Sequence, residues 1–310
     1  MLRLLRHRDV ILVLALLSGL GAGQGAKYCE PLVLPALGLV MTLSVLGVPL
    51  SVIRSPGALV TPTLLSLGAN FLLLGGLQLS LSRLLINQPE IINGFVILAV
   101  VPPAVAVIPF THILQGDRVF SLVGTVGCYL SALVLTPVGA WLFFSGGFLI
   151  HPDKIAVIVG ELILLPLLLA ALLQRWRWDR PIEPYKGTIT NWSFFLITYT
   201  IVGLNRQLFL QQPLALLPVV AIAVATTFLW GEVIEWFCRW QGVSQPRLTS
   251  LVLLGTLKNY GLAGGLALAL FSPQTSVPAA VSTVFMIVYI IWLNLKWQWA
   301  WKQQTKEATL

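Results

Sequence analysis

The sequence predicts an all-α membrane protein of ten transmembrane helices, in two inverted five-helix repeats with crossed, discontinuous fourth and ninth helices. Of its 310 residues, 57% are hydrophobic and only 10% are charged, and the mean hydropathy is +0.89. A soluble domain carries about 25% charged residues, so composition alone excludes that class. The apolar residues fall into ten stretches of membrane-spanning length. The fourth and ninth stretches hold residues that interrupt a helix.

The ten predicted spans follow one another with short connections, so the chain forms one transmembrane domain. They cover residues 9–25, 31–52, 57–84, 91–114, 119–147, 154–174, 189–209, 213–238, 249–271 and 277–300. Five spans in each half, about 1–150 and 151–310, make the second half start from the opposite side of the membrane. The repeats are therefore expected to be inverted, which pairs the fourth span with the ninth.

The first stretch, MLRLLRHRD followed by VILVLALLSGLGAG, has the charged and apolar regions of a signal peptide. The alternative is a short first span. We expect the span to be retained, because the five-plus-five symmetry fails without it.

Lysines and arginines predict the orientation in a cytoplasmic (inner) membrane. Of the 19, 14 fall on the side of the N-terminus, 4 fall on the other side, and Lys258 lies within the membrane. Positive charge stays cytoplasmic, so both termini are expected there. Seven tryptophans fall at predicted cytoplasmic span ends, where they are expected to anchor the helices at the membrane interface: Trp176, Trp178, Trp236, Trp240, Trp297, Trp299 and Trp301. The net charge of +8 is thus assigned to the lipid bilayer and not to a nucleic-acid partner.

Residues for catalysis or for a metal site are scattered. The cysteines and histidines are Cys29, Cys128, Cys238, His7, His112 and His151, and they lie far apart in the sequence. No HExxH, GxSxG or paired aspartates occur. We therefore expect no enzyme, no disulfide framework and no metal site.

The fourth span carries prolines at its middle. Pro102 and Pro103 are adjacent, and Pro109 follows two turns later. Proline removes a backbone donor and clashes with the preceding turn, so this helix is expected to open here. A kinked but purely structural span is the alternative for this segment by itself.

The ninth span holds Lys258 and Asn259 roughly 16 to 20 Å from either end. An ammonium at that depth costs about 2.5 to 3.5 kcal/mol on the mildest scale, so it must face protein or water. Gly255 and Gly261 weaken the helix around it. Inverted repeats whose broken helices meet at the midplane are typical of secondary transporters.

Two polar features lie at predicted cytoplasmic span ends. Glu232, Glu235 and Arg239 are spaced for pairing on one helix face, which favours an interfacial ion-pair cluster over a proton relay. Residues 175–187 form the longest polar connection and join the halves, as a plain connector or as a hinge.

Short motifs match a known transporter family. The fourth-span pattern P-G-G-T-x-S-N-V-x-T-Y-L-A-x-G-D/N is matched at Pro102, Thr111, around Leu114, Gly116 and Asp117. The fifth-span pattern S-x-x-x-T and a later TP are matched at Ser121, Thr125, Thr136 and Pro137. The ninth-span pattern E-x-G-x-Q-N-x-x-L-A is matched at Asn259, Leu262 and Ala263. On these residues the chain resembles the bile acid:sodium symporter superfamily, whose members have ten spans and crossed fourth and ninth helices. Asn70 falls at a third-span glutamine that contributes to ion binding there.

The departures from this resemblance fall on the sodium ligands. Val107 and Ile108 replace a Ser-Asn pair, Leu254 replaces a glutamate, and Lys258 replaces a glutamine. A hard cation needs several oxygen ligands, and the remaining Ser121, Thr125 and Asn70 are too few. We therefore expect that both sodium sites are lost, with no cofactor and no sodium coupling.

Lys258 is expected to fill the place of the ion and to hold the crossed helices through carbonyls freed at the break. It either stays charged in a facilitator or exchanger, or exchanges a proton that couples transport to a proton gradient. The structural alternative is an ion pair with Glu161. The residues predicted for substrate binding or coupling are Lys258, Asn259, Thr256, Asn70, Ser121, Thr125, Thr111 and Glu161, and those predicted for helix breaks are Pro102, Pro103, Pro109, Gly255 and Gly261.

The resemblance implies a secondary transporter of small or amphipathic organic anions, as a monomer or a homo-oligomer. A positive charge and helix N-termini at the crossing also favour an anion. An auxin-efflux-like carrier and a cation/proton antiporter are alternatives, although the antiporter needs a midplane aspartate and Asp117 and Asp153 lie at span ends. A transport-inactive scaffold or sensor is the alternative from another class.

Overall fold

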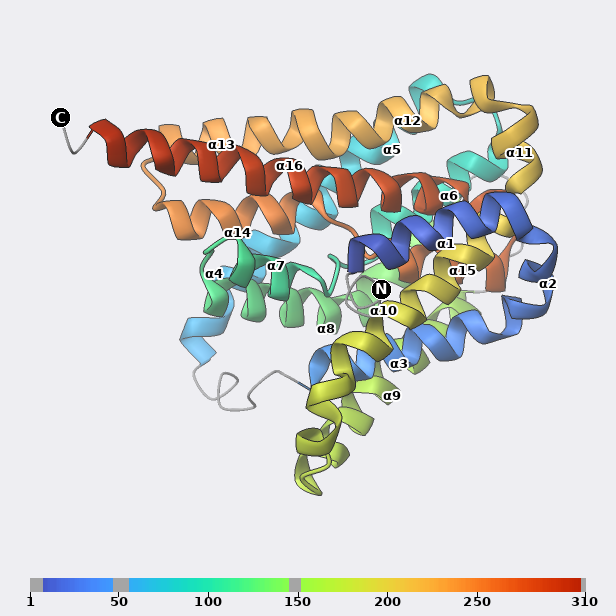
Figure 1. Ribbon diagram of the computed structural model, residues 1–310, viewed down its shortest axis with the longest axis horizontal. Coiled ribbons are helices and arrows are strands. Elements are labelled where there is room, and N and C mark those ends of the chain that lie inside the picture. The colour runs from blue at the N-terminus through green and yellow to red at the C-terminus, as the bar shows by residue number, and fades with distance from the viewer. Residues whose placement is uncertain (1–7, 47–55, 145–151, 308–310) are drawn as a thin grey trace.

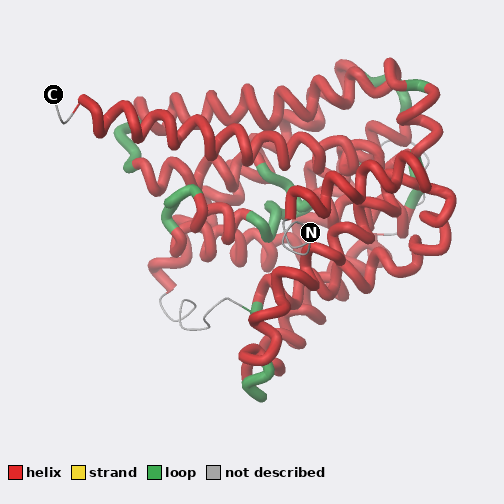
Figure 2. The backbone as a smooth tube through the Cα atoms, in the orientation of Figure 1, coloured by secondary structure: helices red, strands yellow, loops and turns green. Residues whose placement is uncertain are grey.

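The computed structural model describes residues 8–46, 56–144 and 152–307. These residues form helices joined by turns and short extended segments (Figures 1 and 2). Within the described ranges, the one β-type pairing is an isolated bridge between Pro103 and Lys258. The all-helical prediction is confirmed. The ends predicted for the second and fifth spans, 47–52 and 145–147, lie outside the described residues.

The helices follow the predicted spans in order. The first half holds α1 (Arg8–Ala22), η2 (Gly23–Gly25), α2 (Ala26–Cys29), η3 (Glu30–Leu32), α3 (Val33–Val45), α4 (Pro56–Leu67), the π-helix η5 (Gly68–Leu74), α5 (Gly75–Leu85), α6 (Pro89–Val100), α7 (Val107–Ile113) and α8 (Arg118–Phe143). The second half holds α9 (Pro152–Arg175), α10 (Asp179–Leu204), α11 (Arg206–Gln211), η6 (Pro213–Leu216), α12 (Leu217–Val224), the π-helix η7 (Ala225–Leu229), α13 (Trp230–Trp240), α14 (Gln245–Thr256), α15 (Tyr260–Leu270), η8 (Gln274–Ser276) and α16 (Val277–Glu307).

Six helical stretches in the described residues are long and apolar enough to cross a membrane. They are residues 10–44, 59–85, 118–143, 156–175, 213–240 and 274–297, and two shorter apolar helices are Pro89–Val100 and Tyr260–Leu270. Six is fewer than the ten predicted spans. The first two predicted spans run together through the short helices between them, the fourth and ninth are each split in two, and the first part of α10 is polar.

The predicted connection between the halves is mostly helical. α9 ends at Arg175 and α10 begins at Asp179, so Trp176–Trp178 make the turn and the rest of the stretch belongs to α10. Pro181 lies in the first turn of α10, where a proline needs no hydrogen-bond partner for its nitrogen. The turn lies at the tip of a projecting helical hairpin (Figure 1).

Four long helices, α1, α3, α9 and α10, pack as one group. α1 packs along α10, and α3 packs against both α9 and α10. The contact of α1 with α10 is close because a glycine of α1 faces it: a Cβ on Gly19 would lie 2.9 Å from the Cβ of Val202. The Tyr199 hydroxyl also donates a hydrogen bond to the Ala22 carbonyl (2.9 Å).

The remaining helices form a second group. α12 and α13 continue one another through η7 and run alongside α16 in Figure 1, and α13 is joined to α16 by charged side chains. Glu235 accepts hydrogen bonds from Arg239, as the spacing predicts, and also from Lys296 of α16 (2.9 Å). Lys296 contacts Glu232 as well. The predicted cluster is therefore an interhelical ion-pair network.

Candidate functional site

The fourth predicted span is broken at its prolines. α6 ends at Val100 and α7 begins at Val107, so residues 101–106 are not part of either helix. Pro102 and Pro103 have no N–H to donate to the carbonyls one turn earlier, which ends α6 at this point. The Thr136 hydroxyl of α8 donates to the freed carbonyl of Val100 (2.7 Å).

The ninth predicted span is also broken. α14 ends at Thr256 and α15 begins at Tyr260. The side chain of Asn259 caps α15, because its Oδ1 accepts a hydrogen bond from the backbone N–H of Leu262 (3.0 Å). The break thus falls at the lysine and asparagine that interrupt the apolar run.

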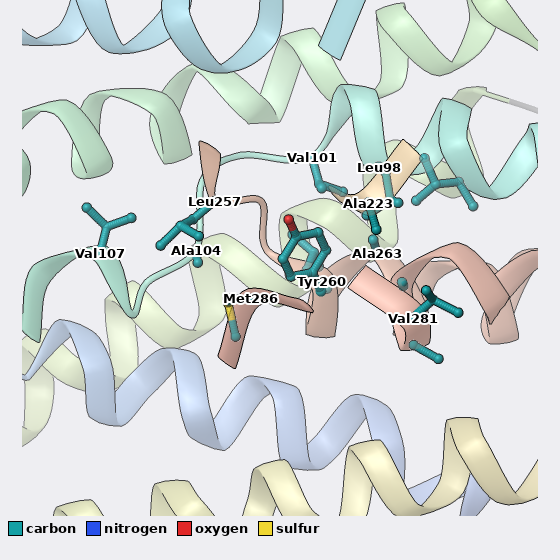
Figure 3. Close-up of a cluster of buried hydrophobic side chains, with 14 of the residues drawn as sticks. Leu98, Val101, Ala104, Val107, Ala223, Leu257, Tyr260, Ala263, Val281 and Met286 are labelled. Atoms are coloured by element: carbon teal, nitrogen blue, oxygen red, sulfur yellow. The ribbon is translucent and has the colours of Figure 1, made fainter. Parts of the chain in front are cut away.

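The two breaks pair with each other. The N–H of Ala104 donates to the carbonyl of Leu257 (3.2 Å), and the N–H of Asn259 donates to the carbonyl of Pro102 (2.9 Å). The two bonds form an antiparallel bridge at the centre of the molecule, where Ala104 and Leu257 lie together (Figure 3). The backbone of each break thereby supplies hydrogen-bond partners for the backbone of the other.

Lys258 belongs to this bridge, and it is fully buried. Its Nζ donates hydrogen bonds to the carbonyls of Ala99 (2.8 Å) and Val101 (2.9 Å), and it lies 4.7 Å from the ring centroid of Phe71. In a regular helix the carbonyl of Ala99 would accept from residue 103, which is a proline. The lysine therefore replaces a hydrogen bond that Pro103 cannot make.

Asn70 donates hydrogen bonds to free carbonyls of the ninth predicted span in the same way. It lies in the π-helix η5, and its Nδ2 donates to the carbonyls of Leu254 (2.8 Å) and Leu257 (3.2 Å). Both carbonyls are freed where α14 ends. The structure thus brings Asn70, Lys258 and Asn259 together at the crossing.

The structure corrects the position of three predicted break residues. Pro109 lies inside the first turn of α7, where a proline is tolerated. Gly255 belongs to the last turn of α14, and Gly261 belongs to the first turn of α15. The breaks occur next to these residues, where Pro102 and Pro103 lack an N–H donor and where Asn259 caps α15.

The predicted hydroxyl residues lie apart from Lys258's hydrogen-bond partners. Thr111 Oγ1 is 2.7 Å from both Ser121 Oγ and the carbonyl of Val107, so these hydroxyls bind each other between α7 and α8. The Thr256 hydroxyl donates within its own helix, to Val252. Thr125 Oγ1 is buried with no hydrogen-bond partner in the described part of the chain.

Glu161 does not reach Lys258. It is exposed on α9, whereas Lys258 is buried and its Nζ contacts carbonyls and a ring. No salt bridge of Lys258 occurs among the described residues. The alternative of a Lys258–Glu161 ion pair is therefore wrong in this structure.

Sequence reasoning missed two members of the site. Phe71 offers its ring to Lys258, and the Tyr129 hydroxyl accepts a hydrogen bond from Asn259 Nδ2 (2.6 Å). Tyr129 follows Ser121 and Thr125 at intervals of four, which places all three on one helix face. That spacing is the signal that could have found it.

A cavity of about 40 Å³ adjoins the crossing and is bordered by α1, α3, α10, α15 and α16. Its walls are mostly apolar, and its polar residues include Thr198, Thr283 and Asn259. Lys258 also borders it, but the partners of its Nζ do not, so the side-chain nitrogen points away from the cavity. The cavity has room for only a few water molecules, so a larger solute requires the helix groups to separate.

These features define a multi-pass helical membrane protein whose two broken helices pair beside an internal cavity. The family model for the Sodium Bile acid symporter family matches residues 34–212, which is more than half of the chain. The chain belongs to this family of transporters, as its broken spans predict. The matched residues include the fourth-span break but not Lys258.

One curated relative supports the same class. The Bacillus subtilis (strain 168) protein named "Uncharacterized sodium-dependent transporter YocS" is 23% identical over 227 residues, which cover 71% of this chain and 67% of that protein. A transporter of this kind acts on a small-molecule substrate within a lipid bilayer.

Proposed function

We propose that the chain is a secondary transporter of small or amphipathic organic anions and that it works without sodium. The observation that carries the proposal is the bond of Lys258 Nζ to the carbonyls of Ala99 and Val101. A lysine side chain is thereby built into the crossing, at a position where the resembling family has an ion ligand.

The geometry argues against sodium at the crossing. A hard cation needs several oxygen ligands, with carboxylate to offset dehydration. Here the carbonyls of Leu254 and Leu257 accept from Asn70, and those of Ala99 and Val101 accept from Lys258. A sodium ion would have to displace these donors. The family name and the name of the relative both mention sodium, and the proposal departs from both.

We further propose ten spans in two inverted repeats. The paired breaks support this, and so do two π-helices at corresponding places, η5 in the third predicted span and η7 in the eighth. The helix packing also fits. In an inverted repeat α1 corresponds to α9 and α3 corresponds to α10, so the packing of α1 with α10 is matched by the packing of α9 with α3.

Two features support an anionic substrate. The cavity borders the N-terminal end of α15, whose dipole is positive there, and Lys258, when protonated, adds positive charge behind the cavity wall. The apolar walls accept a hydrophobic body. Small or amphipathic carboxylates fit these surroundings.

The test has two stages. A thermal-shift screen of organic anions, at several pH values and with or without sodium, selects ligands, because a ligand stabilises the state that it binds. Proteoliposomes are then tested for flux of those ligands. Wild type should carry them and Lys258→Met should not, while keeping a monodisperse size-exclusion profile. A chain that binds the anions without any flux is a scaffold or sensor and contradicts the proposal.

A further inference from the structure

A second cavity of about 30 Å³ lies beside the first, between α3, α7, α8 and α9. Two residues, Met41 and Val105, line both cavities. On α3, Leu37 borders the first cavity, Met41 borders both and Ser44 borders the second. Their spacing of four and three residues places them on one helix face, so the two cavities follow that face over roughly 10 Å.

The wall between the cavities consists of side chains. Asn259 of the first cavity and Tyr129 of the second are joined by their hydrogen bond (2.6 Å). Met41 lies against this pair, with its Sδ 3.8 Å from Asn259 Nδ2. Met41 is 3% exposed and borders both cavities, so its side chain lies between them.

Met41 is the part of this wall that can move at low cost. Methionine is unbranched, with three rotatable bonds, and it adapts to irregular space. Val105 is stiff at χ1 because it is β-branched, and it is fixed next to the paired backbone of the break. Asn259 is held by its bonds to Tyr129 and to Leu262.

The second cavity also holds an unused polar group. Thr125 borders it, is 2% exposed, and its Oγ1 has no hydrogen-bond partner among the described residues. A buried hydroxyl without a partner is costly, and a ligand that reaches the second cavity can supply one. The cavity lies toward the end of α3 that the charge pattern predicts to be cytoplasmic.

We propose that Met41 sets the length of solute that the carrier accepts, because turning it aside joins the two cavities into one elongated site. This inference rests on the proposed transport function and deepens it. Short solutes occupy the first cavity alone. Longer ones with an apolar body pass Met41 and place their far end beside Thr125.

The test uses straight-chain carboxylates from acetate to decanoate, and the alcohols of the same lengths, on purified protein in lipid nanodiscs. Thermal-shift titrations give an apparent Kd for wild type, Met41→Ala, Met41→Phe and Met286→Ala. Met286 borders only the first cavity, so it is the matched control. Met41→Ala should tighten binding of the long members at least about tenfold and Met41→Phe should weaken it at least about tenfold, since a change of even one methylene in an apolar pocket has about that effect. The short members should change little.

The control should shift short and long members equally. Met41 variants that also shift both equally, or a wild type that shows no length dependence in either series, would overturn the role of Met41. The alcohols separate this inference from the proposed function. If carboxylates bind no better than alcohols but Met41 still sets the length preference, the role of Met41 stands and the anion substrate fails.

Discussion

Lys258 donates to the fourth predicted span a hydrogen bond that Pro103 cannot donate. Its Nζ binds the carbonyls of Ala99 and Val101, and Asn70 binds two freed carbonyls of the ninth span in the same way. Each broken helix is thus closed by a side chain from another part of the chain. At the scale of single residues, the site is a set of donors matched to carbonyls that irregular backbone leaves free.

This matching predicts a stability effect at Lys258. Lys258→Met keeps most of the apolar stem but leaves two buried carbonyls without their donor, at about 1 to 3 kcal/mol each. We expect the free energy of unfolding to fall by at least about 2 kcal/mol. Chemical unfolding in a mild detergent measures it.

The control is Lys186→Met. Lys186 lies 3.7 Å from the exposed Glu183, and such surface pairs contribute about 1 kcal/mol or less. If both variants are as stable as wild type, the two carbonyls do not depend on Lys258.

The depth of Lys258 could be predicted from its place in an apolar run, but its acceptors could not. They are backbone carbonyls more than 150 residues away, and backbone groups leave no trace in side-chain pattern. Glu161 was a reasonable partner by charge alone. Lys258 Nζ instead donates to carbonyls because the prolines free them within its reach.

At the scale of helices, the breaks in α6–α7 and α14–α15 fix the arrangement around the crossing. Adjacent prolines predict the first break because their effect is local. The second requires a lysine and an asparagine cap, and the sequence indicates it through the cost of burying charge. The π-helices η5 and η7 carry no comparable sign in the sequence, although η5 carries Asn70 to the crossing.

Close helix packing at the break predicts a difference between two neighbouring glycines. A Cβ on Gly75 would lie 2.7 Å from the carbonyl oxygen of Ala99, which Lys258 also binds, whereas one on Gly76 would meet nothing within 4 Å. Gly75→Ala should be about 1 to 3 kcal/mol less stable than Gly76→Ala, the usual cost of overpacking. The gain in helix propensity cancels between them.

Unfolding of both variants under the same conditions measures this difference. Equal stabilities would mean that α5 and α6 can move apart freely at this point, and that the acceptor carbonyl is not held in place by packing.

At the scale of the whole molecule, two helix groups meet along a seam that contains both cavities. The helix order and the positions of the breaks follow from apolar run lengths, prolines and charges, which are local properties. The seam does not follow from these local properties, because it depends on which helix faces meet the crossing. The helices concerned are α1, α3, α9 and α10. Separation of the two groups along this seam is the motion that a carrier with so small a closed cavity requires.

The absence of sodium coupling is the central claim at this scale. It is tested most directly by uptake of a bound organic anion into proteoliposomes, across a sodium titration with choline holding the ionic strength constant. Because Lys258 occupies the freed carbonyls of the fourth span and Asn70 those of the ninth, we predict that the initial rate is the same at every sodium concentration. A rate that rises steeply and saturates with sodium would contradict the account.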